Sequence, residues 1–222
     1  MVNNAITIAI LTHNRSEMVA RAVRSALQQV TDDFTIQVVV VDDCSDDDTP
    51  SSLKKFGSKI DYIRNSKNVG VGSSSNIALK VTTSEYFVRL DSDDYLSTFF
   101  SLIAINVLRA NEQLSIFTCD YLQVDSDENH KKIISLRNTE IMRQFGAGMV
   151  FRTQRLKDIG GYAEGLRYGE DLDLHIRLGY ETSDRFHFPS PLYRRNIHGS
   201  NLSNDSADQI VREEILRNAK KV

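Results

Sequence analysis

The feature that most constrains the fold is an alternation of short apolar runs with helical segments in the first half of the chain. Residues 6–11, 36–41 and 86–90 are rich in β-branched and aromatic residues, which favours strands. The second run, IQVVVV, is almost continuously apolar, as is typical of a strand buried on both faces. Between the runs, residues 16–30 carry apolar side chains at helical spacing, and residues 73–82 also have helical character. This order predicts an α/β fold with a mostly parallel central sheet flanked by helices.

The regular alternation ends after a helix expected over residues 96–110. Residues 114–124 and 131–136 flank a polar turn and indicate an antiparallel pair, followed later by a β segment near 191–197 and a final helix over 206–219. The chain has 222 residues and only three prolines, with no internal repeat or linker, which suits one domain with a sizeable core. We therefore expect a single domain with a small antiparallel portion in its second half.

The composition limits the binding partners and the cellular location that we expect for this protein. The formal net charge is -3, so no global basic field attracts nucleic acid, and a polyanionic ligand needs local cations or a metal. Cys44 and Cys119 are too few to cross-link a protein of this size and are expected to be reduced thiols. No apolar run approaches the ~20 residues that span a bilayer, and the N-terminus lacks a signal-peptide pattern. We expect a soluble cytoplasmic protein, free or at the inner face of the membrane.

Polar and acidic residues follow three predicted strands where each strand ends. They are Thr12 to Asn14, then Asp42 and Asp43, and finally the run from Asp91 to Asp94. In an open α/β sheet, ligands bind in the crevice beyond the carboxyl ends of the strands. Carboxylates gathered there repel one another unless a cation lies among them, and Mg²⁺ or Mn²⁺ prefers oxygen ligands and often bridges substrate phosphates. A single Asp here is ordinarily a loop residue or a helix cap, but three after one buried strand favour a functional site.

Six segments in the same order carry a family resemblance. They are ITIAILTHNR, VVVVDDCSDDDT, NVGVGSSSNIAL, YFVRLDSDDYL, GGYAEGLRYGEDLDL and LYRRNIHGSNLS, and they extend from about residue 6 to 203. Together they resemble the successive motifs of family 2 glycosyltransferases, inverting enzymes with a GT-A fold. The resemblance implies transfer of one sugar from a nucleotide-sugar, most simply a UDP-sugar, to an acceptor hydroxyl in glycan or polysaccharide biosynthesis. It also implies Mn²⁺ or Mg²⁺ as the cofactor.

The resemblance implies a nucleotide-binding role for several residues at the strand ends. These residues are Thr12, Asn14, Asp43, Asn68, Asp91 and Asp93. Asp43 would accept the N3–H of a uracil base, since a carboxylate facing a buried imide N–H makes a strong charge-assisted hydrogen bond. Asp91 and Asp93 would contact the ribose hydroxyls. For Asn76, a nucleotide contact and a structural role inside its helix are both open.

The resemblance also implies the metal ligands and the catalytic residues. Asp93, Asp94 and His198 are the candidate ligands, and the choice between the two aspartates as direct ligand is open. Asp171, with its neighbour Glu170, is the implied catalytic group, and Asp171 would be the general base that takes the proton of the acceptor hydroxyl. A purely structural explanation is also open for these residues. Acidic residues such as Glu170 and Asp171 are favoured in any first helical turn, and a histidine such as His198 is common in a surface loop.

The sequence departs from the family pattern at Leu11, His13, Cys44 and Ser75, and the last two bear on the structure of the expected nucleotide pocket. Cys44 replaces a Gly, so it would be strained if the loop needs a positive φ there. Ser75 stands where an Arg often precedes Asn76, which leaves the aspartates less compensated. The chain also contains no Trp, whereas the processive members carry a Gln-x-x-Arg-Trp motif, so we expect a non-processive enzyme.

Two other functions are compatible with parts of the sequence. A catalytically inactive sugar-nucleotide-binding domain would keep the same pocket. A haloacid-dehalogenase-type phosphatase also uses an Asp-x-Asp pair after a strand, but that class does not explain six motifs in register. For the enzyme, the expected acceptor is a glycan, a lipid-linked or a protein hydroxyl, and peripheral membrane association and a homodimer are both open. Residues 1–94 would form the nucleotide-binding half, 95–203 the acceptor side and 204–222 a C-terminal helix.

Overall fold

The computed structural model describes residues 4–125, 127, 129–137, 146–166, 168–179, 183–199, 201 and 206–219. Its strands are β1 (Ala5–Thr12), β2 (Thr35–Asp42), β3 (Asp61–Arg64), β4 (Tyr86–Asp91), β5 (Tyr95–Leu96), β6 (Ile116–Val124), β7 (His130–Ile134), β8 (Val150–Arg152) and β9 (Arg185–Asn196). Its helices are α1 (Val19–Leu27), α2 (Thr49–Lys54), η1 (Gly57–Lys59), α3 (Val71–Val81), α4 (Phe100–Ala110), α6 (Thr153–Asp158), α7 (Glu170–Leu178) and α8 (Ser206–Ala219). Within these ranges, no helix has the length and apolar character needed to span a membrane.

The strands form one mixed sheet in the order β3-β2-β1-β4-β8-β6-β9-β5, with β7 paired to β6. The first four strands of this order run parallel to one another, as the alternation in the sequence predicts. β8 is antiparallel to both of its neighbours, β6 and β7 form the expected antiparallel pair, and β6 and β9 are parallel. The predicted fold class, a mostly parallel sheet with a small antiparallel portion in the second half, is confirmed.

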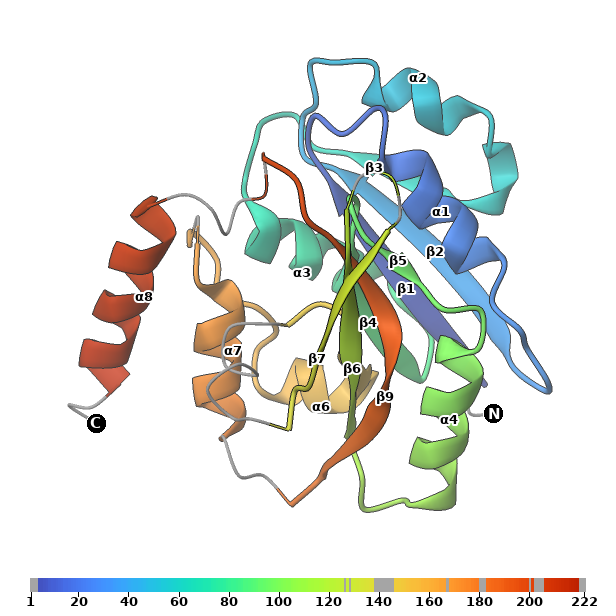
Figure 1. Ribbon diagram of the computed structural model, residues 1–222, viewed down its shortest axis with the longest axis vertical. Coiled ribbons are helices and arrows are strands. Elements are labelled where there is room, and N and C mark those ends of the chain that lie inside the picture. Colours follow the sequence, from blue (N-terminus) through green and yellow to red (C-terminus); the bar gives the residue numbers. More distant parts are fainter. Residues whose placement is uncertain are drawn as a thin grey trace.

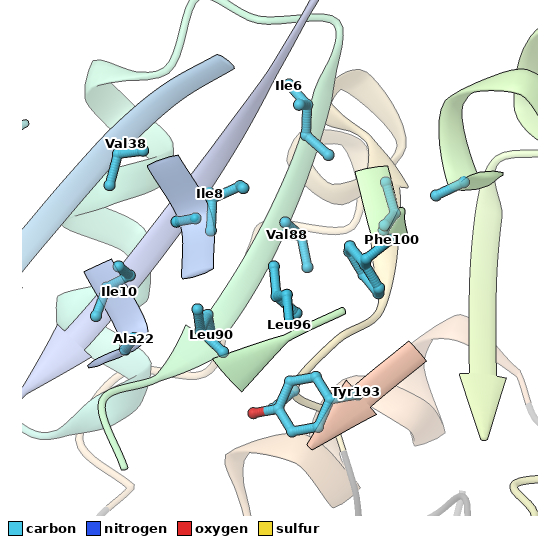
Figure 2. Close-up of a cluster of buried hydrophobic side chains, with 14 of the residues drawn as sticks. Ile6, Ile8, Ile10, Ala22, Val38, Val88, Leu90, Leu96, Phe100 and Tyr193 are labelled. Carbon is cyan, nitrogen blue, oxygen red and sulfur yellow. The ribbon is translucent and has the colours of Figure 1, made fainter. Parts of the chain in front are cut away.

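Each face of the sheet buries its own apolar cluster, because side chains alternate along every strand. In β1, Ile6, Ile8 and Ile10 belong to one cluster, whereas Ala9 and Leu11 belong to the other. Helices α1 and α4 cover the first face, and Figure 2 shows part of the cluster beneath them. Helices α3, α6 and α7 contribute to the second cluster, and α8 lies alongside α7 at the edge of the molecule (Figure 1). The central strands are therefore covered on both faces and hold their carboxyl ends firmly.

The structure differs from the sequence-based expectation most clearly at β9. A strand is expected near 191–197, but β9 begins at Arg185. Pro189 and Pro191 lie inside it, and a proline cannot donate to a strand ladder, so the sequence pattern does not indicate a strand there. The pairing with β6 shifts register at this point, with Cys119 opposite Phe188 but Asp120 opposite Pro191. The irregularity in the ladder accommodates the two prolines.

Cys44, in the loop after β2, adopts a left-handed backbone conformation with φ of 64°. From the sequence, strain is expected at this position if the loop needs a positive φ, and the structure confirms that need. A non-glycine residue in this region costs roughly 1–2 kcal/mol. Hydrogen bonds on either side hold the loop in place: the Asn14 N–H donates to Ser45 Oγ, and the Asp46 N–H donates to Asn14 Oδ1.

Replacing Cys44 with glycine is expected to stabilise the protein. Relief of the left-handed strain outweighs the roughly 0.4–1 kcal/mol that a glycine loses through the entropy of the unfolded chain, so we expect a gain of up to about 1 kcal/mol. Asp46→Gly is the matched control, because Asp46 is exposed in the same loop and has no positive φ. It should lose stability. Urea unfolding measures both changes, and a Cys44→Gly variant less stable than the parent protein would contradict the assignment of strain.

Candidate active site

The carboxyl ends of β1, β2 and β4 meet at one edge of the sheet. The strand register sets Thr12 beside Asp42 and Leu11 beside Asp91. Beyond these ends lies a cavity of about 430 Å³, a volume typical of small-molecule sites. Its polar lining comes from Thr12, His13, Asn14, Arg15, Asp43, Ser74, Arg89, Asp91, Ser92, Asp93, Asp94, Tyr168, Glu170, Asp171, Arg195, Asn201, Asp208 and Arg212.

Asp43 lines one wall of the cavity, and its carboxylate holds the loop that leads into α3. Its Oδ1 accepts hydrogen bonds from Asn65 Nδ2 at 2.8 Å and from the Val69 N–H at 2.9 Å, and its Oδ2 accepts one from the Gly70 N–H at 2.8 Å. A carboxylate offers about four acceptor positions, so Oδ2 retains capacity for one further donor from a ligand. Asp43 thus joins two loops and still faces the cavity.

The other residues expected to bind the nucleotide occupy different settings. Thr12 lines the cavity, and its buried Oγ1 has no hydrogen-bond partner among the described residues. Asn14 also lines the cavity, but its side-chain oxygen accepts the Asp46 N–H. Asn68 is exposed and does not line the cavity. Asn76 binds the backbone N–H and C=O of Tyr162 at 2.9 Å each, which favours the structural role left open for it.

The centre of the site is a buried guanidinium surrounded by three carboxylates. Arg89, on β4, has a side chain only 2% exposed. Its Nε lies 3.3 Å from Asp91 Oδ1, its Nη1 lies 3.1 Å from Glu170 Oε1, and Nη1 and Nη2 lie 2.9 and 3.0 Å from the two oxygens of Asp171. The backbone of Gly146 approaches the Asp171 carboxylate so closely that a Cβ would not fit. Arg89 therefore fixes the start of α7 against the end of β4.

The excess of negative charge changes the ionisation of this cluster. Burial raises the pKa of Glu170 to about 7, the charge of Asp171 adds to the shift, and Arg89 opposes it. Burial likewise raises the pKa of Asp91 to about 6, with Arg89 opposing and the charges of Asp93 and Asp171 adding. Burial lowers the pKa of Arg89, but Asp171, Asp91 and Glu170 more than offset this. Burial first, and the neighbouring carboxylates second, therefore favour proton uptake by Glu170 and Asp91, and Arg89 opposes it.

Asp93 and Asp94 point to different partners. Asp94 is buried, and its two oxygens accept hydrogen bonds from the Tyr193 hydroxyl at 2.6 Å and from the Asn196 N–H at 2.8 Å, so it anchors the end of β9. Asp93 Oδ2 lies 3.0 Å from His198 Nε2. The geometry therefore favours Asp93 over Asp94 as the carboxylate available to a ligand.

The Asp93–His198 pair suits a divalent cation. Asp93 Oδ2 and His198 Nε2 form a hydrogen bond of 3.0 Å, which brings a carboxylate oxygen and an imidazole nitrogen side by side, both of them atoms that bind divalent cations. Across the described part of the chain, no three His, Cys, Asp or Glu side chains gather as a metal site. Mg²⁺ is commonly held by only one or two protein groups together with substrate phosphates, so two ligands suffice for a cation shared with a nucleotide.

Arg89 is the residue of this site that the sequence motifs do not single out. It is the one charged residue in YFVRL, a segment that otherwise has the apolar character of a buried strand. A long charged side chain is almost never fully buried unless it is paired. An Arg inside an apolar strand, two residues before an Asp cluster, is therefore the signal that could have indicated a buried ion-pair network.

These features define a class of protein: an α/β domain whose crevice beyond parallel strand ends is suited to a phosphorylated ligand and a cation. Comparison with known protein families identifies the family within this class. The chain belongs to glycosyl transferase family 2, because the model of that family matches residues 7–167. Asp91 and Asp93 therefore sit in a family 2 glycosyl transferase and not in a phosphatase of the haloacid dehalogenase type.

Individual relatives agree with this assignment. The chondroitin synthase of Escherichia coli is 28% identical over 212 residues, which cover 89% of this chain but 30% of that protein. TarS of S. aureus, residues 1–349 in complex with UDP-GlcNAc, has a similar fold with a TM-score of 0.79 at 22% identity, covering 97% of this chain and 65% of that one. The mannosyltransferase PcManGT from Pyrobaculum calidifontis, in complex with GDP-Man and Mn²⁺, has a TM-score of 0.71 at 16% identity, covering 96% and 62%. This chain thus spans less than two thirds of each of them.

Removing the buried cation should strongly destabilise the fold. Arg89→Met leaves buried carboxylates without their counter-charge, a change that typically costs about 3–5 kcal/mol. Arg217→Met is the matched control, because the Arg217 side chain is 76% exposed in its pair with Glu213. The control should change stability by less than about 1 kcal/mol. Urea unfolding compares the two, and similar small losses in both would show that the Arg89 network is not central to the structure.

Proposed function

We propose that the protein transfers one sugar from a nucleotide-sugar donor, most simply a UDP-sugar, to an acceptor hydroxyl, with inversion at the anomeric carbon. The observation that carries the proposal is the convergence of Asp43, of Asp91 with Asp93, and of Asp171 on one cavity from three separate segments. Family membership supports the reaction type. The relatives named above support the donor class, because TarS is seen with UDP-GlcNAc and PcManGT with GDP-Man.

On this proposal the nucleotide lies along the ends of β1 and β2. The base meets Asp43, whose Oδ2 accepts one hydrogen bond among the described residues, from the Gly70 N–H, and can also take the imide N–H of uracil. The unpartnered Oγ1 of Thr12 supplies a second polar contact in the same wall. Asp91 takes up the ribose hydroxyls, and Arg15, which lies 3.9 Å from Asp93, adds positive charge on the phosphate side.

Asp93 and His198 are proposed to hold Mn²⁺ or Mg²⁺ together with the diphosphate. The bound cation offsets the negative charge that develops on the leaving nucleoside diphosphate. Support comes from the 3.0 Å spacing of the two ligand atoms and from the Mn²⁺ in the PcManGT complex. Asp94 takes a supporting role, because both of its oxygens already bind β9.

Asp171 is proposed as the general base, with Arg89 as the residue that orients it. The acceptor oxygen forms its bond to the anomeric carbon as the bond from that carbon to the phosphate oxygen breaks, and the electron pair leaves with the diphosphate. The proton of the acceptor hydroxyl passes to Asp171. Because attack and departure occur on opposite sides in a single step, the configuration inverts. Glu170 shares the guanidinium of Arg89 and helps to hold this geometry.

The proposed setting is the synthesis of a glycan or polysaccharide, which agrees with the chondroitin synthase relative. The acceptor is then a hydroxyl of a glycan, of a lipid-linked saccharide or of a protein, and the absence of Trp favours one addition per encounter. Residues 1–94 bind the nucleotide, residues 95–203 form the acceptor side, and the C-terminal helix follows. The competing function is a binding domain without catalysis, which predicts donor binding but no turnover.

Hydrolysis of a UDP-sugar in the presence of Mn²⁺ separates these two functions. The parent protein should slowly release free sugar and UDP, since water can replace the acceptor. Asp171→Asn should slow the release by about 10²–10⁴-fold, because that is the usual contribution of a general base. UDP binding, followed by thermal shift, should stay close to that of the parent protein.

Asp173→Asn is the matched control for this experiment. Asp173 lies on the same helix, but its carboxylate pairs with Arg177 at 2.7 Å and does not line the cavity. Its hydrolysis rate should equal that of the parent protein. Full activity in Asp171→Asn would overturn the base assignment, and donor binding without hydrolysis in the parent protein would favour the inactive binding domain.

A further inference from the structure

Helix α8 brings two charged side chains into the cavity on the side away from the nucleotide. Asp208 and Arg212 line the cavity, and Asp208 is buried although it lies in the first turn of the helix. Arg212 Nε donates to Asp208 Oδ2 at 2.7 Å. The glycosyl-transfer chemistry proposed above uses neither residue.

The packing of α8 on α7 places this pair beside the proposed base. A Cβ on Gly169 would meet the Ile215 side chain at 2.8 Å and Arg212 Cγ at 3.6 Å, so α8 lies directly over Gly169. Gly169 immediately precedes Glu170 and Asp171 at the start of α7. The two helices lie side by side in Figure 1. A group bound by Asp208 and Arg212 would therefore lie at the acceptor side of Asp171.

The hydrogen bonding of the pair is incomplete. Arg212 Nη1 is buried and has no partner within the part of the chain that the structure describes. A buried donor without a partner is costly, so a ligand atom that accepts from it gains a contact that the free protein lacks. The hydrogen bond from Arg212 is to Oδ2 of Asp208, and the other carboxylate oxygen, Oδ1, is an acceptor that can meet the same ligand. The pair thus offers one donor and one acceptor side by side.

The charge of the surroundings selects the kind of ligand. The charges of Asp208 and Arg212 cancel each other, so the pair has no net attraction for an anion. Among the described side chains that line the cavity, seven carboxylates outnumber four arginines, so an anionic acceptor would be repelled. Vicinal hydroxyl groups, which both donate and accept, match the pair instead. Tyr168 lines the same cavity and is an aromatic residue of the kind that packs against the C–H face of a sugar.

We propose that α8 forms the acceptor subsite and that Arg212 and Asp208 bind the hydroxyl groups of a neutral sugar at the end of the acceptor. This inference rests on the proposed glycosyl transfer, because it names the acceptor class of the same cavity. A sugar held there presents its free hydroxyl to Asp171. Acceptor specificity then depends on a helix that lies beyond the sheet and not on the strand ends that bind the donor.

Saturation-transfer NMR with methyl glycosides tests the subsite directly. Methyl glycosides of glucose, galactose, N-acetylglucosamine and N-acetylgalactosamine are added to the protein with UDP and Mn²⁺, and methyl glucuronide serves as the anionic comparison. At least one neutral glycoside should show saturation transfer and weak saturable binding. Arg212→Met and Asp208→Asn should each weaken that binding by about tenfold or more, because each loses a charge-assisted hydrogen bond.

Two further variants keep the test decisive. Arg212→Lys retains the charge and the stem that packs on α7 but not the planar fork, and it should lose binding as Arg212→Met does. Arg217→Met, on the same helix but largely exposed, should bind like the parent protein. Absence of any neutral-glycoside signal, preference for the glucuronide, or unchanged binding in the Arg212 and Asp208 variants would overturn the proposal. Donor hydrolysis by the parent protein is measured in parallel: its absence counts against the proposed function, and its presence without glycoside binding counts against the subsite alone.

Discussion

The ion-pair network around Arg89 is the interaction on which the rest of the site depends. It joins the end of the parallel sheet, through Asp91, to the start of α7, through Glu170 and Asp171. These segments are far apart in the sequence, and their carboxylates would repel one another in a buried setting without the guanidinium. A single planar group with several donors meets them at once, which lysine could not do. The family often has an Arg at the position of Ser75, and in this protein Arg89, on the strand beneath the cavity, provides the positive charge instead.

The two sides of the cavity are built in different ways. On the side proposed to bind the nucleotide, backbone N–H groups of the loop before α3 and the side chain of Asn65 hold Asp43, and Asn14 ties together the loops after β1 and β2. On the other side, the cavity is lined from α7, from the segment after β9 and from α8. A preorganised nucleotide side combined with an acceptor side made of peripheral elements would let acceptor preference change without disturbing donor binding.

Much of the fold follows from the sequence, because the central strands and the long helices carry strong periodic signals. The apolar runs of β1, β2 and β4, the helix α8 and the convergence of the acidic strand ends all agree with the structure. Local pattern could not reveal side-chain partners: the pairing of Arg89 with the carboxylates of α7, the binding of Asp94 to Tyr193, and the exposure of Asn68 depend on contacts between distant segments. The sequence pattern also missed the first half of β9. Pro189 and Pro191 disfavour a strand locally, and the pairing with β6 overrides that preference.

The proposed reaction requires the cavity to bind a nucleoside diphosphate together with a divalent cation held by Asp93 and His198. Calorimetric titration of UDP in Mn²⁺ and in EDTA, with the parent protein and with Asp93→Asn, tests this requirement. Mn²⁺ should strengthen UDP binding to the parent protein by about tenfold or more, equivalent to roughly 1.4 kcal/mol, and should have little effect on the variant. Equal UDP affinity with Mn²⁺ and EDTA in the parent protein, or an undiminished Mn²⁺ effect in Asp93→Asn, would contradict it.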